Sequence, residues 1–312
     1  MAPFAVATEM TLASSPADDV QVYRGNADSE WTIHLVPHGG YLLALILNAC
    51  MQHQAASHNP DPIHVTAHFL RATVVGPLEV HIRTVRTGKA LSNFSAELIQ
   101  DGAVNITTHL VFGVLDASTL PPPEMPFNLH PPALHARITP LTTHPSACPP
   151  RQFLFFQHFS GYLDNYVDEA LGVLPNPSGG IAIGEWLAMR DPADKQLTLP
   201  SLAFFSDIFP ALLPSVVAEL GPSWFPTVVL SLEFKAPIPR GTNSVGAYVT
   251  SRFIADPQGR HDVYCELWTA PQGEDDGGNW REKQRCLLVS HQTALVMSMA
   301  MNEKKGKGKS RL

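Results

Sequence analysis

Cysteine is scarce in this sequence, and its spacing argues against two kinds of stabilised fold. Only four cysteines occur among 312 residues, at positions 50, 148, 265 and 286. No pair has the Cys-x-x-Cys spacing of a structural zinc site, and the set does not suggest a disulfide framework. We therefore predict a protein of a reducing compartment that has no zinc cage.

Charged residues are also few, and basic residues do not exceed acidic ones. Lys and Arg number 21 against 28 Asp and Glu, which gives a formal net charge of −7, and charged residues make up only 16% of the chain. A nucleic-acid-binding protein would show a basic excess, so we predict no nucleic-acid partner. With 45% hydrophobic residues, the chain can form a large core and two domains of ordinary size.

Long hydrophobic segments are absent as well. The main apolar run, Tyr41 to Met51, is well short of the ~20 residues that a membrane-spanning helix needs. The first ten residues, MAPFAVATEM, carry no Lys or Arg ahead of their short apolar stretch, so we do not expect a secretory signal there. We predict no membrane span.

The apolar run belongs to the stretch His38 to His53, HGGYLLALILNACMQH, which predicts a buried helix. It is apolar on all sides, as is typical of a helix that is covered on all sides. Gly39 and Gly40 open it and leave its N-terminus bare enough for another group to approach closely.

The residues after this helix follow a strand pattern. Apolar and polar residues alternate from Ile63 onward, and Asp101-Gly102 is a strong hairpin signal. A second apolar stretch, Leu202 to Leu220, predicts a helix that Pro210 and Pro214 would bend or split, and further strands begin at Val228. The two halves therefore resemble a diverged tandem repeat of a helix followed by strands.

A proline-rich stretch separates the halves and predicts a stiff, extended connector rather than a packed element. We therefore divide the chain into an N-terminal unit, a proline-rich linker, a C-terminal unit and a basic flexible tail, at residues 1–115, 116–150, 151–300 and 301–312.

The order of these elements resembles the double hotdog fold of the acyl-CoA thioesterase II type. The resemblance is carried by HGGYLLALILNACMQ and by HFLRATVVGPLEVHIRTVRTGKALSNFSAELIQDG, and it extends more weakly over residues 150–298. It implies an α+β fold in which each of two repeats wraps a central helix in an antiparallel sheet. It also implies hydrolysis of an acyl-CoA substrate to a free acid and CoA, with no cofactor and no metal. A homo-oligomer is possible because hotdog units commonly associate further.

The resemblance also implies a catalytic Asp, Thr and Gln, all in the second repeat. The family's Asp lies on the second helix, and FFSDIFPAL places Asp207 there. The family's Thr begins a strand that leads to an aromatic-x-x-Pro, and TVVLSLEFKAP places Thr227 there. The family's Gln lies in the last strand, where VSHQTALV offers Gln292. Its flanks depart from the usual Gln-Glu-Gly, so Gln284 remains an alternative.

Thioester hydrolysis needs a positioned water, a proton acceptor and donors for the oxyanion. Asp207 at a helix start can act as the base, and Thr227 and Gln292 can hold the same water. Backbone N–H groups at Gly39 and Gly40 can stabilise the negative charge that develops on the thioester oxygen. Each feature also has a plain structural explanation: a favourable first-turn charge for Asp207, ordinary strand positions for Thr227 and Gln292, and a tight turn for the glycines.

Other polar residues near these positions have weaker cases. His38, His64 and His68 are interpreted as surface or strand-face residues, because histidine occurs 14 times in the chain. Four basic residues could meet CoA phosphates, although a solvated sheet edge also explains each: Arg71, Arg83, Arg86 and Lys89.

Three other functions remain open for the same fold. A hydratase or dehydratase would pair the Asp with a histidine a few residues later, whereas the next histidine after Asp207 is His261. A biosynthetic enzyme would act on a carrier-bound or CoA-bound polyketide or acyl thioester. A non-catalytic acyl-binding protein is the third alternative, and the presence of all three polar candidates argues mildly against it.

The basic C-terminal residues end in Ser310-Arg311-Leu312, which resembles the peroxisomal signal Ser-Lys-Leu. A frayed tail can also end this way by chance. We expect a peroxisomal protein if the signal is used, and a cytoplasmic one otherwise.

Overall fold

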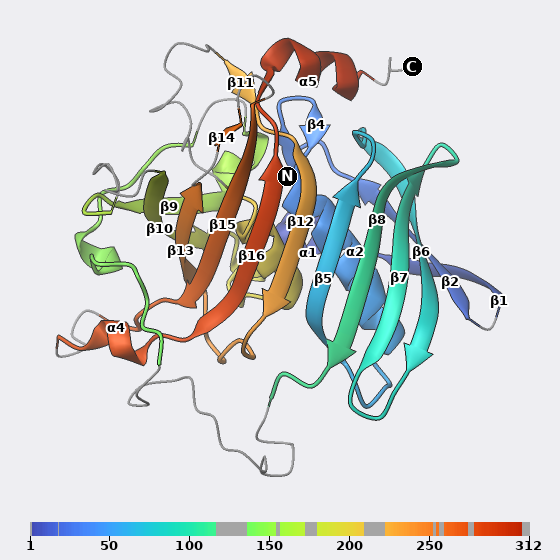
Figure 1. The fold of residues 1–312 in the computed structure, drawn as a ribbon, viewed down its shortest axis with the longest axis horizontal. Coiled ribbons are helices and arrows are strands. Elements are labelled where there is room, and N and C mark those ends of the chain that lie inside the picture. Colours follow the sequence, from blue (N-terminus) through green and yellow to red (C-terminus); the bar gives the residue numbers. More distant parts are fainter. Residues whose placement is uncertain are drawn as a thin grey trace.

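The computed structural model describes residues 2–17, 19–116, 136–153, 157–171, 180–208, 222–251, 254–255, 259–273 and 278–307. Their strands form one long antiparallel sheet in the order β1-β2-β6-β7-β8-β5-β12-β16-β15-β13-β10-β9, with β14 paired to β15. Strand β5 of the first half pairs directly with β12 of the second, so the sheet runs through both halves (Figure 1).

The first half contains the elements α1 (Phe4–Ala7), β1 (Thr11–Ala17), β2 (Val20–Ala27), β3 (Thr32–Ile33), β4 (Val36–Pro37), α2 (Gly39–Gln54), β5 (Asp61–Phe69), β6 (Gly76–Thr87), β7 (Ser92–Gln100) and β8 (Ala103–Gly113). Helix α2 confirms the helix predicted from His38 to His53. The side chains of Leu43, Leu45 and Ile46 are fully buried although they lie on different sides of the helix. The all-round apolar pattern thus reflects a helix that is enclosed by protein.

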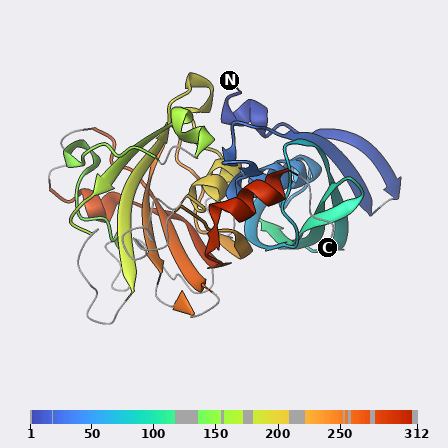
Figure 2. The ribbon, with the colours of Figure 1, turned by 90° about the horizontal axis from the view of Figure 1, so that it is seen from above.

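The second half contains three short 3-10 helices, η2 (Pro145–Ala147), η3 (His158–Tyr162) and η4 (Pro192–Asp194). Its other elements are β9 (Leu163–Asp168), β10 (Ile181–Met189), α3 (Leu199–Phe205), β11 (Ser223–Trp224), β12 (Thr227–Phe234), β13 (Ser244–Ser251), β14 (Ile254–Ala255), β15 (Arg260–Thr269), α4 (Trp280–Lys283), β16 (Cys286–Ala294), β17 (Met297–Ser298) and α5 (Met299–Gly306). Every residue of α3 from Pro200 to Phe205 is buried. Seen from above, the strands of each half curve around a helix (Figure 2). This arrangement confirms the predicted α+β double hotdog.

No helix within the described ranges has the length and hydropathy needed to cross a bilayer.

The two central helices pack against each other unusually closely. A Cβ atom added to Gly40 of α2 would lie 2.6 Å from the carbonyl oxygen of Ala203 and 3.0 Å from the Cα of Phe204, both in α3. Such distances are shorter than van der Waals contact, so only glycine allows this approach. The N-terminus of α2 therefore meets the end of α3 at the junction of the halves.

The predicted extended linker is wrong over residues 136–150. Leu141 is fully buried against Trp186 of β10, and a Cβ added to Gly246 of β13 would lie 2.2 Å from its Cδ1 atom. Thr142 and Thr143 hydrogen-bond to the buried carboxylate of Asp168. Prolines disfavour an α-helix or a regular strand here, but they do not prevent apolar burial against glycine-lined strands.

The predicted flexible tail is also wrong over residues 301–307. Residues up to Gly306 belong to helix α5, and the fully buried Asn302 side chain bonds both to the Ile33 carbonyl and to the Leu35 N–H. The basic composition of this segment predicts a solvated tail, but the side-chain amide of Asn302 binds it to the β3–β4 hairpin. Ser310, Arg311 and Leu312 lie outside the described residues, so peroxisomal targeting stays a prediction.

Candidate active site

Asp207 lies just beyond the end of α3, not at the start of a helix as the sequence predicted. Thr198 begins α3 with a capping box, and the helix ends at Phe205. Pro210 follows in the sequence and lacks the N–H that would bond to the carbonyl of residue 206, which disfavours continuation of the helix. Pro210 and Pro214, and the predicted helix from residue 209 to 220, lie outside the described residues.

The carboxylate of Asp207 instead reaches the start of the other central helix. Its Oδ2 atom accepts a hydrogen bond of 2.6 Å from the backbone N–H of Gly40, in the first turn of α2. The N-terminus of a helix carries partial positive charge, so it stabilises an anion placed there. Asp207 thus belongs to the second half, whereas the helix dipole that stabilises its carboxylate belongs to α2 of the first half.

Both glycines are needed at this contact. A Cβ on Gly39 would lie 2.8 Å from Asp207 Oδ2, and a Cβ on Gly40 would lie 2.8 Å from the Asp207 Cβ. The Gly40 N–H is occupied by Asp207, which revises the prediction that it binds the oxyanion. The Gly39 N–H makes no hydrogen bond within the described part of the chain, and Gly39 borders the cavity described below.

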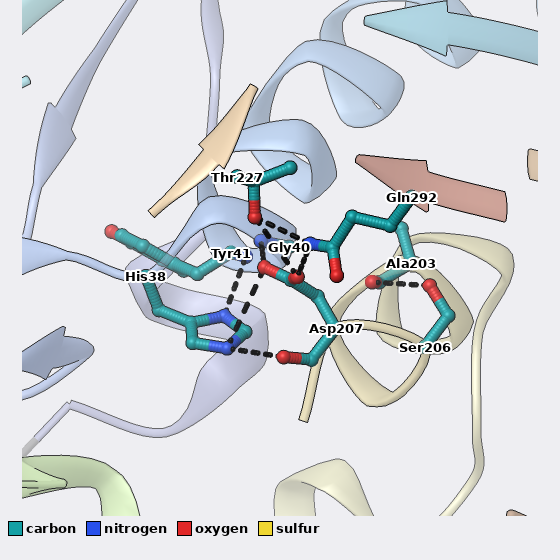
Figure 3. A network of polar contacts seen from close by, with 8 residues as sticks. All are labelled: His38, Gly40, Tyr41, Ala203, Ser206, Asp207, Thr227 and Gln292. Carbon is teal, nitrogen blue, oxygen red and sulfur yellow. Dashed lines mark hydrogen bonds and ion pairs between the residues drawn. The ribbon is translucent and has the colours of Figure 1, made fainter. Parts of the chain in front are cut away.

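Thr227 and Gln292 complete the cluster from adjacent strands β12 and β16 (Figure 3). The Gln292 amide donates to Asp207 Oδ1 at 2.6 Å and also to the Thr227 hydroxyl, while that hydroxyl donates to Asp207 Oδ1 at 3.3 Å. The structure therefore brings the three predicted polar residues together. Gln284 lies apart from them, because its amide bonds to Thr269 and to the Trp280 carbonyl.

Burial is the main influence on the Asp207 carboxyl group. The residue is only 6% exposed, and burial raises the pKa of its carboxyl above the ordinary value of 3.8. Nearby His38 and the hydrogen bonds from Gly40, Gln292 and Thr227 favour the ionised form and partly oppose this shift in pKa. The result is a desolvated but well-supported carboxylate with raised basicity.

His38 is the functional residue that the sequence interpretation missed. It is buried between Phe159 and Phe204, and its Nε2 lies 3.0 Å from the Asp207 carbonyl oxygen and 3.6 Å from Oδ2. The Tyr41 N–H donates to Nδ1, so we assign the proton to Nε2, which then donates to the carbonyl. Burial lowers the pKa of His38, consistent with a neutral ring.

His38 therefore positions Asp207 through its backbone. The sequence signal for it was its place immediately before the glycines, where a side chain can cap the new helix. The other two histidines agree better with their interpretation. His68 is exposed on β5, and half-buried His64 bonds to Ser231.

A cavity of about 280 Å³ opens beside the cluster. Its walls are mostly apolar, and both Asp207 and Thr227 contribute to it, as do His38 and Gly39. Gln292 is not among the cavity-lining residues and lies behind Asp207 and Thr227. The arrangement can hold a water molecule against the Asp207 carboxylate and the Thr227 hydroxyl, beside an apolar group of a ligand in the cavity.

Within the described ranges, no three His, Cys, Asp or Glu side chains are grouped to hold a metal ion.

Comparison with protein families gives two matches that together cover most of the chain. Residues 27–113 match a model of the acyl-CoA thioesterase N-terminal domain. Residues 140–296 match the acyl-CoA thioesterase C-terminal domain. The second match begins within the segment that was predicted to be a linker, in agreement with its packing on β10.

Three similar proteins illustrate the range of relatives. The ustilagic acid biosynthesis cluster protein orf2 of Mycosarcoma maydis is 38% identical over 95 residues, which span 29% of this chain and 24% of that protein. The thioesterase-like protein TwmA of Talaromyces wortmannii is 22% identical, with 94% of this chain and 93% of TwmA covered. A crystal structure of a hot dog fold protein of unknown function from Alicyclobacillus acidocaldarius superposes with a TM-score of 0.70 at 20% identity, covering 95% and 98% of the two chains.

Proposed function

The chain belongs to the acyl-CoA thioesterase family, and from this premise we propose that it hydrolyses an acyl-CoA to a free carboxylic acid and CoA with water activated by Asp207. The observation that carries the proposal is the buried Asp207 carboxylate at the edge of an apolar cavity, held by Gly40, Thr227 and Gln292. A carboxylate of raised pKa is a better general base than an exposed one.

The steps follow from the positions of these groups. Water lies against the Asp207 carboxylate and the Thr227 hydroxyl, and its oxygen attacks the thioester carbonyl carbon while Asp207 accepts a proton. The Gly39 N–H donates to the oxyanion, with support from the α2 dipole. When the tetrahedral intermediate collapses, the carbon–sulfur bond breaks, and the CoA thiolate takes the proton back from Asp207. Gln292 keeps both side chains in position for these steps.

The alternative hydratase chemistry has less support from this geometry. His261 bonds to the Gly259 carbonyl through Nδ1. His38 does lie close to Asp207, but its two ring nitrogens are occupied by the Tyr41 N–H and the Asp207 carbonyl. A ring held in this way serves to position Asp207, and it lacks a free nitrogen with which to exchange protons with a substrate.

A second candidate substrate is an acyl or polyketide chain on a biosynthetic carrier. It is favoured by one similar protein, the ustilagic acid biosynthesis cluster protein orf2, whose name places it in a biosynthesis cluster. The cleaved bond would be the same thioester, so the proposed roles of Asp207 and Thr227 would not change.

Release of free thiol tests the proposed function. Purified protein is given acyl-CoAs of several chain lengths and an acyl carrier protein loaded with the same acyl groups, and the free thiol is followed with a chromogenic reagent. We expect turnover of at least one acyl-CoA. Thiol release from the carrier protein alone would favour the biosynthetic alternative, and no release from any thioester would refute hydrolysis.

The pH dependence of the reaction tests the state of Asp207. Because burial raises the pKa of Asp207, the carboxylate should become protonated, and kcat/KM should fall, at a pH above the ordinary Asp value of 3.8. Neutral His38 has a lowered pKa and should add no acid limb near its ordinary value of 6.5. The measurement is kcat/KM between pH 3.5 and 8 in buffers of constant ionic strength. An acid limb at or below 3.8 would contradict the buried base.

A further inference from the structure

The C-terminal helix α5 forms part of the wall of the cavity. Asn302 anchors it, since this fully buried amide accepts from the Leu35 N–H at 3.1 Å and donates to the Ile33 carbonyl at 2.9 Å. A Cβ added to Gly306 would lie 2.4 Å from the Leu35 Cβ, so the helix presses directly on the β3–β4 hairpin. Figure 2 shows α5 lying across the junction of the two halves.

This anchoring fixes the backbone at Lys305, which lies between Asn302 and Gly306, the two residues of α5 that contact the β3–β4 hairpin. Lys305 is half-buried and lines the same cavity as Asp207. Its neighbour Lys304 is exposed and does not line the cavity. The same helix thus offers one lysine at the cavity and one directed elsewhere.

Arg71 contributes a second cation from the other half of the molecule. It follows β5, is exposed, and lines the cavity together with Phe69 and Leu70. Its position is also fixed, because the backbone N–H of Arg71 donates to the Asn105 carbonyl and its guanidinium donates to the Val104 carbonyl at 2.7 Å. By contrast, Arg83 pairs with Asp19 and is not a lining residue.

The charge of the cavity differs in sign from that of the chain. The chain carries a formal charge of −7, yet Arg71 and Lys305 are the cations of the cavity lining and Asp207 is the only acidic residue among the described residues that line it. Asp207 is buried, whereas Arg71 is exposed. The cavity therefore has an anionic catalytic end and a cationic, more accessible part.

We propose that Lys305 of α5 and Arg71 together bind a phosphate of the phosphopantetheine-bearing part of the substrate, which makes α5 a specificity-determining element. This inference rests on the proposed thioesterase function. With the thioester at buried Asp207, the charged arm of the substrate must leave through the accessible part of the cavity. Both CoA and the prosthetic group of an acyl carrier protein carry a phosphate on the pantetheine arm.

Three octanoyl thioesters separate the phosphate from the rest of the substrate: octanoyl-pantetheine, octanoyl-phosphopantetheine and octanoyl-CoA. For Lys305→Gln and for Arg71→Gln we expect KM to rise about 3- to 10-fold with the two phosphorylated substrates, with kcat nearly unchanged, because a partly exposed ion pair is lost. KM for octanoyl-pantetheine should not change. Lys304→Gln is the matched control and should behave as wild type with all three.

The same comparison identifies the source of the phosphate. Equal effects with octanoyl-phosphopantetheine and octanoyl-CoA would assign the site to the pantetheine phosphate that CoA and carrier proteins share. An effect with octanoyl-CoA alone would assign it to the nucleotide phosphates and hence to CoA. An equal change in KM with octanoyl-pantetheine, or no change with any substrate, would overturn the proposal.

A binding measurement keeps the inference separate from the proposed function. S-octyl-CoA, a thioether that cannot be hydrolysed, is titrated calorimetrically into wild type, Lys305→Gln and Lys304→Gln at two salt concentrations. Weaker binding of about 3- to 10-fold in Lys305→Gln alone, with a smaller difference at high salt, supports the site even if no thioester is hydrolysed. Normal turnover with unchanged binding would refute the phosphate site and leave the thioesterase function standing.

Discussion

Asp207→Asn should lower kcat for acyl-CoA hydrolysis by about 100- to 10,000-fold, which is the range that loss of a general base produces. The amide cannot accept the proton of the attacking water, whereas its size and shape match those of the carboxylate. The measurement is the initial rate of CoA release at saturating substrate and at the pH where wild type is fastest.

The variant should remain folded because the cluster can adapt to the amide. The Asn oxygen can still accept the Gly40 N–H, and the Asn NH₂ group would face the Gln292 amide. Gln292 Oε1 is buried without a hydrogen-bond partner among the described residues, so rotation of that amide supplies an acceptor.

The stability of Asp207→Asn should also depend on pH in a defined direction. The folded-state pKa of Asp207 is raised above its unfolded value, so the ionised carboxylate destabilises the fold at neutral pH. This penalty disappears as pH falls toward 3.8. The variant should therefore gain stability relative to wild type near pH 7, and the difference should shrink toward pH 4 in denaturant titrations. Asp101→Asn, at an exposed turn residue with positive φ that asparagine tolerates, is the matched control for both measurements.

Gly40→Ala should remove most activity and also destabilise the protein. The new Cβ would lie 2.6 Å from the Ala203 carbonyl oxygen and 3.0 Å from the Phe204 Cα, which are both backbone atoms, and 2.8 Å from the Asp207 Cβ. None of these atoms is the far end of a flexible side chain, so the contacts cannot be relieved by a rotamer change. We expect α2 and α3 to separate, at a cost of about 1 to 3 kcal/mol in unfolding free energy. Separation would also break the Gly40–Asp207 hydrogen bond, so kcat should fall at least about tenfold.

Gly161→Ala is the matched control for this substitution. A Cβ at Gly161 would meet nothing within 4 Å, so kcat and the thermal midpoint should stay close to wild type. The measurements are thermal unfolding by circular dichroism and thiol release. A Gly40→Ala protein with wild-type kcat would show that close contact of the two helices is not needed for the reaction.

The fold was largely predictable from the sequence because its signals are local. The apolar run after Gly40 is compatible only with a helix that is buried on all sides. The alternation of apolar and polar residues from Ile63 onward specifies which face of β5 is buried. Asp207, Thr227 and Gln292 were located through family order and not through chemistry, since each alone is an ordinary residue at its position. The pairing of β12 with β16 brings Thr227 and Gln292 within hydrogen-bond distance, and the end of α3 brings Asp207 to both of them.

The remaining features depend on contacts between the halves, which no local pattern records. His38 looks like a surface residue in the sequence, but α3 and η3 bury it against Asp207. The oxyanion role predicted for Gly40 failed because the carboxylate of the other half already occupies its N–H. Asn302 is one polar residue in a basic tail, and only the β3–β4 hairpin gives it partners.

The central claim is that water held by Asp207, and not Asp207 itself, attacks the thioester. One turnover of enzyme in excess over acyl-CoA, carried out in ¹⁸O-enriched water, tests it directly by mass spectrometry of the released acid and of the peptide that contains Asp207. We expect one ¹⁸O atom in the acid and none in the peptide. An ¹⁸O atom in Asp207, with unlabelled acid, would show that the carboxylate forms an anhydride with the acyl group, and would contradict this account.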